Sequence, residues 1–225
     1  RIHYVITDGG KAPNVVPNFA EVYYYARDKD RQVVMNIFDR IVKAAEGAAL
    51  GTETQMEYEI IGGTHELLPN ITLQRMVHEK LVQVGGYSYS ESEKEFAESI
   101  FKTLEKPLPI STAEKIVPFK EVGTPGGSTD VGDVSFAVPT VGMRIATWAP
   151  GTPSHSWQAV AAGKTSIAHK GMMVAAKTIT LSAIELFEKP KLIEQAKAEF
   201  SQRRGKNFTY TPLIGDRAPA LDYRN

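Results

Sequence analysis

The 225-residue sequence predicts an α/β protein of two domains, and three observations carry this prediction. Residues 1–64 follow the order strand, strand, helix, strand, which forms part of a ferredoxin-like sandwich. Helical patterns begin after Asn70, and two short apolar runs near residues 134–147 precede a long amphipathic helix. We therefore place a second, larger α/β domain over residues 65–225.

The first domain opens with two predicted strands, over residues 2–7 and 20–27. The first strand ends at the turn signal Asp8-Gly9-Gly10, and an irregular stretch rich in Pro and Asn leads to the second. We expect the two strands to flank a loop.

A helix and a third strand are predicted to complete this domain. Asp28 or Asp30 can cap a helix over residues 31–50, with Gly51 just beyond its end. Its apolar face consists of Val34, Ile37, Phe38, Ile41, Val42 and Ala45. Beyond it, Met56, Tyr58 and Ile60 alternate with polar residues, which predicts a strand with one covered face.

The second domain is predicted to mix helices with buried strands. The opening Ser90-Glu91-Ser92-Glu93 fits a capping box, in which a serine and a glutamate bond each other's backbone N–H groups. The expected helices cover residues 73–84, 92–104, 166–187 and 190–204, and the expected buried strands cover residues 134–138 and 141–147.

Composition narrows the function classes. The 26 basic and 26 acidic residues cancel, so no global field favours nucleic acid or an anionic membrane. The sequence has no cysteine, so any metal needs His, Asp or Glu ligands. No apolar run approaches the roughly 20 residues of a bilayer span. We expect a cytoplasmic protein, and its opening without Met, directly in a strand, makes us expect a preceding segment.

Several short motifs favour ordinary structural roles. Gly163-Lys164-Thr165 imitates the end of a phosphate-binding loop, but Gln158 stands where that loop requires a glycine. His65 and His78 are each followed by a glutamate, yet neither has the second histidine of a zinc helix. We interpret His65, His78 and His169 as structural or surface residues.

Two loop segments carry more information. The run Gly123 to Asp133 combines glycines, hydroxyls and carboxylates, so its backbone can approach a ligand closely; tight turns alone explain it about equally well. The run Pro150 to Trp157 holds His155 on a loop constrained by Pro and Gly. A lone histidine is more often structural, because a catalytic metal normally needs about three protein ligands.

The order of the motifs resembles the aminoacylase and carboxypeptidase G family of metallopeptidases and amidohydrolases. The series is Gly9-Gly10, Pro13-Asn14-Val15-Val16-Pro17, a strand ending in Arg27, Gly127-Ser128-Thr129-Asp130, and Ser154-His155-Ser156. The resemblance covers nearly the whole chain. It implies that residues 1–64 are the later part of a lid and dimerisation domain, and that residues 65–225 are the C-terminal part of a zinc-peptidase-like catalytic domain.

The resemblance also implies roles for single residues. His155 matches a metal-ligand histidine, and Asn14 and Arg27 match lid positions that bind the substrate, the guanidinium being suited to a carboxylate. Gly127 and Thr129 match the loop that lines the substrate site, whereas Asp130 is expected to hold that loop in shape. The partners implied are an N-acyl amino acid, such as an aminobenzoyl-glutamate-like amide, or a dipeptide, and a second copy in a homodimer.

The sequence departs from the family where the metal site should begin. The family's His-x-Asp ligand motif, its Glu-Glu pair and its lid histidine have no counterpart here. We therefore expect no catalytic residue in this chain. Two divalent metals per complete site, zinc or else manganese or cobalt, should bind this chain alone weakly or not at all.

Three functions stay open at this point. The chain is a segment of an amidohydrolase that is inactive alone, or a non-catalytic paralogue that dimerises or binds carboxylates through Arg27. The third is a mononuclear hydrolase using His155 with Asp130 or Asp133, which we favour least. Nucleic acid and membrane partners are not expected.

Overall fold

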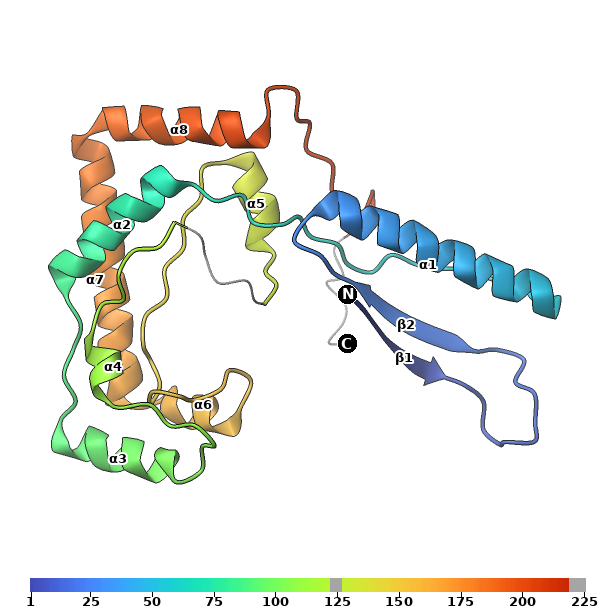
Figure 1. The fold of residues 1–225 in the computed structure, drawn as a ribbon, viewed down its shortest axis with the longest axis horizontal. Coiled ribbons are helices and arrows are strands. Elements are labelled where there is room, and N and C mark those ends of the chain that lie inside the picture. The colour runs from blue at the N-terminus through green and yellow to red at the C-terminus, as the bar shows by residue number, and fades with distance from the viewer. Residues whose placement is uncertain (122–126, 219–225) are drawn as a thin grey trace. The chain divides into compact units, whose positions relative to one another are not determined.

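The computed structural model describes residues 1–121 and 127–218, which fold into two compact units (Figure 1). The first unit is formed by residues 1–67, 129–133 and the segment from Thr209 onward, and the second by residues 68–128 and 134–208. The elements are β1 Ile2–Asp8, β2 Glu21–Ala26, α1 Arg31–Thr52, α2 Ile71–Val84, α3 Glu91–Phe101, α4 Ser111–Glu114, α5 Val131–Ala137, α6 Trp157–Ala162, α7 Ser166–Glu188 and α8 Pro190–Arg204.

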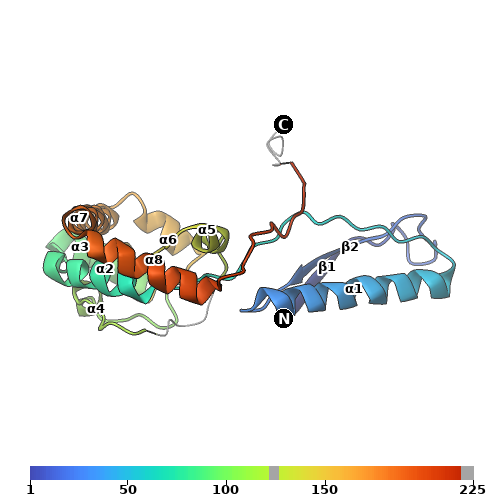
Figure 2. The same cartoon turned by 90° about the horizontal axis from the view of Figure 1, so that it is seen from above.

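A β-hairpin and one long helix make up the regular part of the first unit. Strands β1 and β2 pair antiparallel, with Tyr4 opposite Tyr24 and Val5 opposite Tyr23. Helix α1 runs alongside the hairpin, as both ribbon views show (Figure 2). These three elements match the predictions, but none of their residues is buried.

Local capping fixes the ends of α1. The side chain of Asp30 accepts a hydrogen bond from the Gln32 N–H at 2.7 Å, so Asp30 and not Asp28 is the cap. The helix continues through Gly51, and Glu53 ends it by taking a left-handed conformation at φ 55°. The predicted end was therefore too early.

The third strand, predicted from Met56, Tyr58 and Ile60, is not formed. Residues 54–70 are without regular structure, although the Tyr58 ring lies 5.6 Å from that of Phe38 on α1. Alternation of apolar residues gives a chain one covered face, but a strand also needs a neighbour for its N–H and C=O groups. Within the described residues, β1 and β2 pair only with each other.

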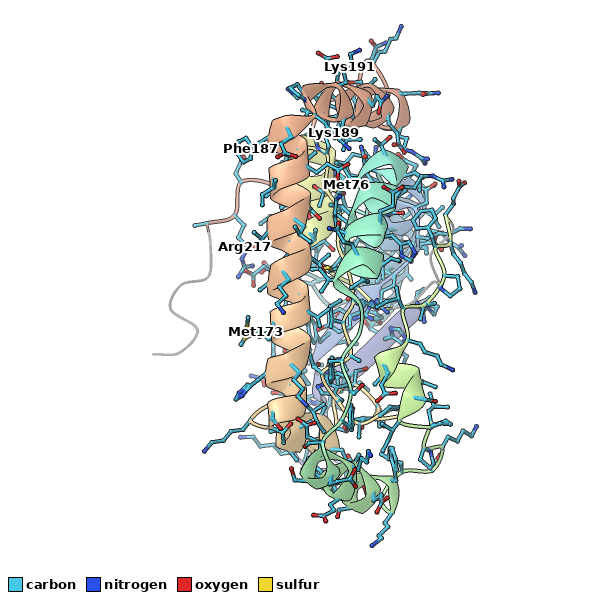
Figure 3. All side chains as sticks on the ribbon, turned by 90° about the vertical axis from the view of Figure 1, so that its left-hand side faces the viewer. Met76, Met173, Phe187, Lys189, Lys191 and Arg217 are labelled. Carbon is cyan, nitrogen blue, oxygen red and sulfur yellow. The ribbon has the colours of Figure 1, made fainter. Side chains whose placement is uncertain are left out.

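The second unit is built around α2, α7 and α8, whose apolar sides meet in the core. The capping box of α3 is present: the Ser90 side chain accepts from the Glu93 N–H, and the Glu93 side chain from the Ser90 N–H. The outer side of α7 carries exposed Met173 and Phe187 (Figure 3). Buried residues form two clusters, one of Leu73, Met76, Val77 and Ala196 and one of Tyr89, Ala97, Ile100, Ala149 and Ile167.

Both predicted buried strands of this unit are wrong. Residues 134–137 belong to helix α5, because a short apolar run has no periodicity that separates a strand from a buried helix. Residues 141–147 are without assigned structure and pair with no strand in the described ranges. The expected α/β architecture is therefore a mostly helical chain with one two-stranded sheet.

Candidate functional site

A cluster of three side chains ties together distant parts of the first unit. His65 is buried, and its Nδ1 lies 2.8 Å from Oδ1 of Asp133. The His65 backbone N–H donates to the other oxygen of the same carboxylate at 3.2 Å. The Tyr210 hydroxyl donates to Oδ1 at 2.9 Å, and its ring lies against the imidazole. We call His65, Asp133 and Tyr210 the loop anchor.

The loop anchor holds residues 129–133 directly against the backbone of the 65–66 segment. A Cβ atom on Gly132 would lie 1.9 Å from the carbonyl oxygen of His65, so only glycine fits there. Within the loop, the Thr129 hydroxyl accepts a hydrogen bond from the Val131 N–H at 3.2 Å. The loop is thus fixed by its own hydroxyl and by the carboxylate at its end.

Asp130 does not have the loop-shaping role expected of it. Its side chain makes no hydrogen bond or ion pair with any residue of the described ranges, and the side chain is exposed. Asp133 makes the contacts instead. Sequence reasoning missed this residue because its partners lie 68 and 77 positions away, a separation that leaves no local pattern.

The Tyr210 hydroxyl responds electrostatically to this position. Its hydrogen bond to the Asp133 carboxylate raises the pKa of the phenol above the ordinary value of 10.0, because ionisation would place two negative charges side by side. The hydroxyl therefore stays protonated and continues to donate.

Arg27 lies directly after β2, at the open end of the hairpin. Its backbone N–H donates to the carbonyl of Arg1 at 2.8 Å, which extends the pairing by one residue. Its guanidinium carbon lies 4.9 Å from the ring centroid of Tyr25. The guanidinium forms no ion pair with any carboxylate of residues 1–121 and 127–218.

Asn14 lies at the other end of the hairpin, in the exposed connection between β1 and β2. Gly10 supports this connection with φ 96°, packing closely on Pro17. Because the six residues of β2 separate the connection from Arg27, the structure does not bring Asn14 and Arg27 together. Their assignment to one substrate site stays a prediction.

His155 and Gly127 belong to the second unit and both have positive φ. His155 is exposed on the loop before α6, with φ 60°, a conformation that side chains other than glycine adopt at a cost. The next residue, Ser156, caps α6 by accepting from the Ala159 N–H at 3.2 Å. Gly127 has φ 74°. Residues Gly123 to Gly126 of its motif lie outside the described residues.

The residues present do not fit a dinuclear metal centre. Within residues 1–121 and 127–218 there is no group of three or more His, Asp or Glu side chains that could hold a metal ion. Asp133 is engaged by His65 and Tyr210, and His155 lies on a different unit. The described side chains therefore support no catalytic step through a metal.

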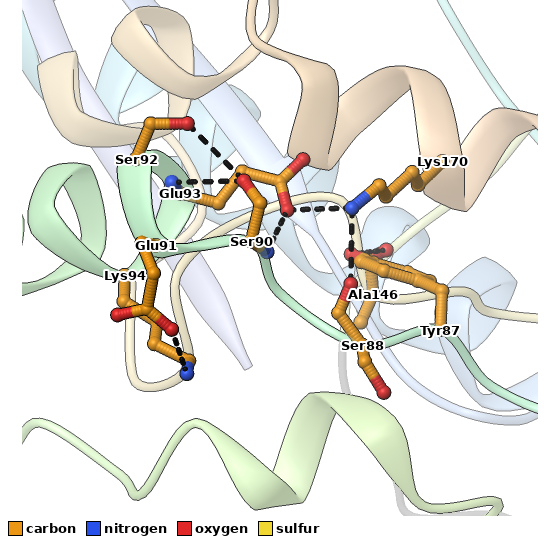
Figure 4. A network of polar contacts seen from close by, with 9 residues as sticks. All are labelled: Tyr87, Ser88, Ser90, Glu91, Ser92, Glu93, Lys94, Ala146 and Lys170. Carbon is orange, nitrogen blue, oxygen red and sulfur yellow. Dashed lines mark hydrogen bonds and ion pairs between the residues drawn. The ribbon is translucent and has the colours of Figure 1, made fainter.

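A second polar network stabilises the second unit (Figure 4). Lys170 donates to the buried carboxylate of Glu93 at 2.6 Å and to the Ser88 carbonyl at 3.0 Å. Burial alone would raise the pKa of Glu93, but hydrogen bonds from Lys170, Ser166 and the Ser90 N–H outweigh it and lower the pKa from 4.5 to about 2. This network connects α7 to the start of α3.

Comparison with known proteins supplies the family. One of the subunits of p-aminobenzoyl-glutamate hydrolase from Escherichia coli (strain K12) is 36% identical over 246 residues, which cover 98% of this chain and 51% of that protein. The chain is homologous to this hydrolase. The resemblance to the aminoacylase and carboxypeptidase G family, drawn from the order of the motifs, is thereby confirmed.

Two further relatives are peptidases. The Xaa-Arg dipeptidases of Homo sapiens and Mus musculus are 25% and 26% identical over 203 residues, which cover 89% of the chain and 40% of each enzyme. The chain thus spans about half the length, or less, of the relatives it matches. No protein-family model matches it. No described helix is long and apolar enough to cross a membrane.

Proposed function

We propose that this chain is one part of a metal-dependent amidohydrolase that cleaves the amide bond of N-acyl amino acids, aminobenzoyl-glutamate-like compounds or dipeptides. The observation that carries the proposal is its homology, over 98% of its length, to the Escherichia coli p-aminobenzoyl-glutamate hydrolase. The dipeptidases, which are more distant relatives, act on another amide. By the names of these relatives, both substrates join an acyl group to an amino acid that carries a free carboxylate.

Arg27 is the proposed carboxylate-binding residue. A guanidinium offers several N–H donors in a fixed plane, which suits both oxygens of a carboxylate. The Tyr25 ring supports the Arg27 guanidinium, and no described acidic side chain occupies it. It therefore keeps its donors for a ligand. In this proposal residues 1–64 act as a lid that also dimerises, residues 65–225 belong to the catalytic domain, and Asn14, Gly127 and Thr129 line the substrate site.

His155 is the proposed metal ligand of this chain. Its imidazole is exposed, and its left-handed backbone is a strained conformation of the kind that structures retain at functional positions. A complete centre needs further ligands, which we propose come from a segment of the whole hydrolase that this chain does not include. When bound, zinc or a similar ion would activate the water that attacks the amide carbonyl.

A non-catalytic paralogue is the second candidate, and the absence of a three-ligand group in the described residues favours it. Such a chain would bind a carboxylate through Arg27, or dimerise, without hydrolysis. The mononuclear alternative is disfavoured, because Asp133 is already bonded within the loop anchor.

The test measures bound metal and hydrolysis of p-aminobenzoyl-glutamate. The chain is assayed alone and together with the part of the Escherichia coli protein that it does not match. We expect activity only in the mixture, lost with His155→Ala and with a raised KM but little change in kcat for Arg27→Ala. Arg40→Ala, an exposed arginine on α1 without an ion pair in the described ranges, is the control. Two bound metals and turnover by the chain alone would contradict the proposal.

A further inference from the structure

One extended segment of the second unit leaves its backbone hydrogen-bonding groups unused. Residues 141–145 lie between α5 and α6, and their N–H and C=O groups make no hydrogen bond with any described residue. Just beyond them, the carbonyls of Ala146 and Trp148 accept from the hydroxyls of Tyr87 and Tyr89. The segment is therefore held extended from one end, with a free backbone edge before it.

The side chains of this segment alternate as they do in a strand. Val141 and Met143 pack against the cluster that contains Leu73, whereas Gly142 and Arg144 are exposed. This is the pattern of a strand with one covered face. What the segment lacks is a neighbouring strand, which explains why it is not assigned as one.

A cavity of about 350 Å³ lies beside this segment, entirely within the second unit. Its wall includes Gly142 to Ala146 and, from another extended stretch, Lys115 to Val117 and Phe119. That second stretch also makes no backbone–backbone hydrogen bond with the described residues, but Pro118 lacks an N–H and limits pairing there. Strand pairing is thus concentrated on residues 141–145.

The charges around the cavity have one sign. Its charged lining residues are Lys115 and Arg144, His78 of α2 also lines it, and no acidic residue does. Neither cation forms an ion pair with a residue of the described ranges. An occupant that carries carboxylates beside an apolar centre complements this wall.

We propose that residues 141–145 accept an added β-strand from another polypeptide, with alternating apolar residues and acidic side chains near its ends. Main-chain hydrogen bonds to the free edge supply affinity, while Lys115 and Arg144 select the acidic flanks. The inference rests on the proposed function in one respect: the strand belongs to the part of the hydrolase that this chain does not match. A helix or a small apolar ligand would leave the backbone edge unpaired.

Hydrogen exchange of the 225-residue chain tests the proposal directly. The probe is a short capped peptide in which valine and threonine alternate between terminal glutamates. At saturation we expect slower exchange of the amides of residues 141–145, and no protection from the same peptide methylated on alternate backbone nitrogens. Equal protection by the methylated peptide would show side-chain uptake without strand pairing, and absence of protection by the unmodified peptide would overturn the proposal.

Substitutions separate the charge contribution. Arg144→Ala and Lys115→Ala are each expected to weaken peptide binding by at most about fivefold, as for exposed ion pairs. Lys191→Ala, an exposed cation on α8, is expected to change nothing (Figure 3). Slower exchange at residues 141–145 that depends on the concentration of the chain itself would identify a second copy as the occupant and contradict the proposal.

The unmatched part of the Escherichia coli hydrolase is the second probe. It should protect the same amides whether or not the mixture hydrolyses an amide. Protection without hydrolysis would count against the proposed function alone, whereas hydrolysis without protection would count against strand addition alone.

Discussion

The imidazole of His65 lies 2.8 Å from the carboxylate of Asp133, which follows 68 residues later in the chain. This contact, with the Tyr210 hydroxyl on the same carboxylate, fixes the loop of residues 129–133. The carboxylate accepts three hydrogen bonds in all. Such a shared acceptor makes one side chain responsible for three anchoring contacts.

Asp133→Ala is expected to lower the free energy of unfolding by about 1–3 kcal/mol, because it leaves the buried His65 N–H groups without their acceptor. Urea denaturation followed by tryptophan fluorescence measures this. Asp130→Ala, three residues earlier and without hydrogen-bond partners in the described ranges, is the control and should change stability by less than about 0.5 kcal/mol. Equal effects of the two substitutions would show that the anchor contributes nothing specific.

Glu93 predicts an acid-sensitive contribution to stability. Its pKa is about 2 in the folded protein against 4.5 ordinarily, so the ionised form is favoured by folding. This stabilisation is fully present above about pH 5 and disappears as the pH falls to about 2. The stability difference between the native chain and Glu93→Gln should therefore be largest near neutrality and shrink over that range.

The control for this prediction is Glu91→Gln. Glu91 is exposed and pairs with Lys94 on the same helix at 2.7 Å. Its substitution should change stability little at any pH. A difference for Glu93→Gln that stays constant from about pH 7 to about pH 2 would contradict the assigned ionisation.

Two glycines in helices should respond to alanine with opposite signs. A Cβ atom on Gly171 would lie 2.3 Å from the carbonyl oxygen of Ala146, so Gly171→Ala should destabilise by about 1–3 kcal/mol. Nothing lies within 4 Å of the same position on Gly47, so Gly47→Ala should stabilise α1 by about 0.5–1 kcal/mol. Thermal unfolding by circular dichroism measures both, and two changes of the same sign would be inconsistent with this packing.

The conformation of His155 gives a further prediction. At φ 60° a β-branched residue is strained, whereas glycine is not. His155→Val should lower the melting temperature, and His155→Gly should leave it equal or higher. If both variants melt alike, the left-handed conformation at residue 155 is not maintained in solution.

The sequence predicted those elements that local chemistry determines. Helix α1 with its Asp30 cap, the capping box at Ser90 and the two strands of the hairpin follow from patterns within one or two turns of chain. The strands predicted at Met56–Ile60 and Val141–Thr147 were wrong for one shared reason. Their alternation is that of strands, but strand formation depends on a partner that no local pattern reveals.

The candidate site was only partly accessible to sequence reasoning. Arg27 and His155 were found through the order of motifs, and their geometry is compatible with ligand binding. The shaping role in the 129–133 loop was assigned to Asp130, although Asp133 makes the anchoring contacts. Distance in the chain hid its partners His65 and Tyr210, since tertiary contacts alone connect them.

The hairpin and α1 contain no buried residue, although all three elements are apolar on one side. The heat capacity change of unfolding scales with apolar surface that leaves water on folding. Unfolding of α1 and the hairpin therefore adds little to that change, and calorimetry of this chain would report mainly the loss of the α2–α7–α8 core. A partner that covers the hairpin would be recognised by a negative heat capacity of binding.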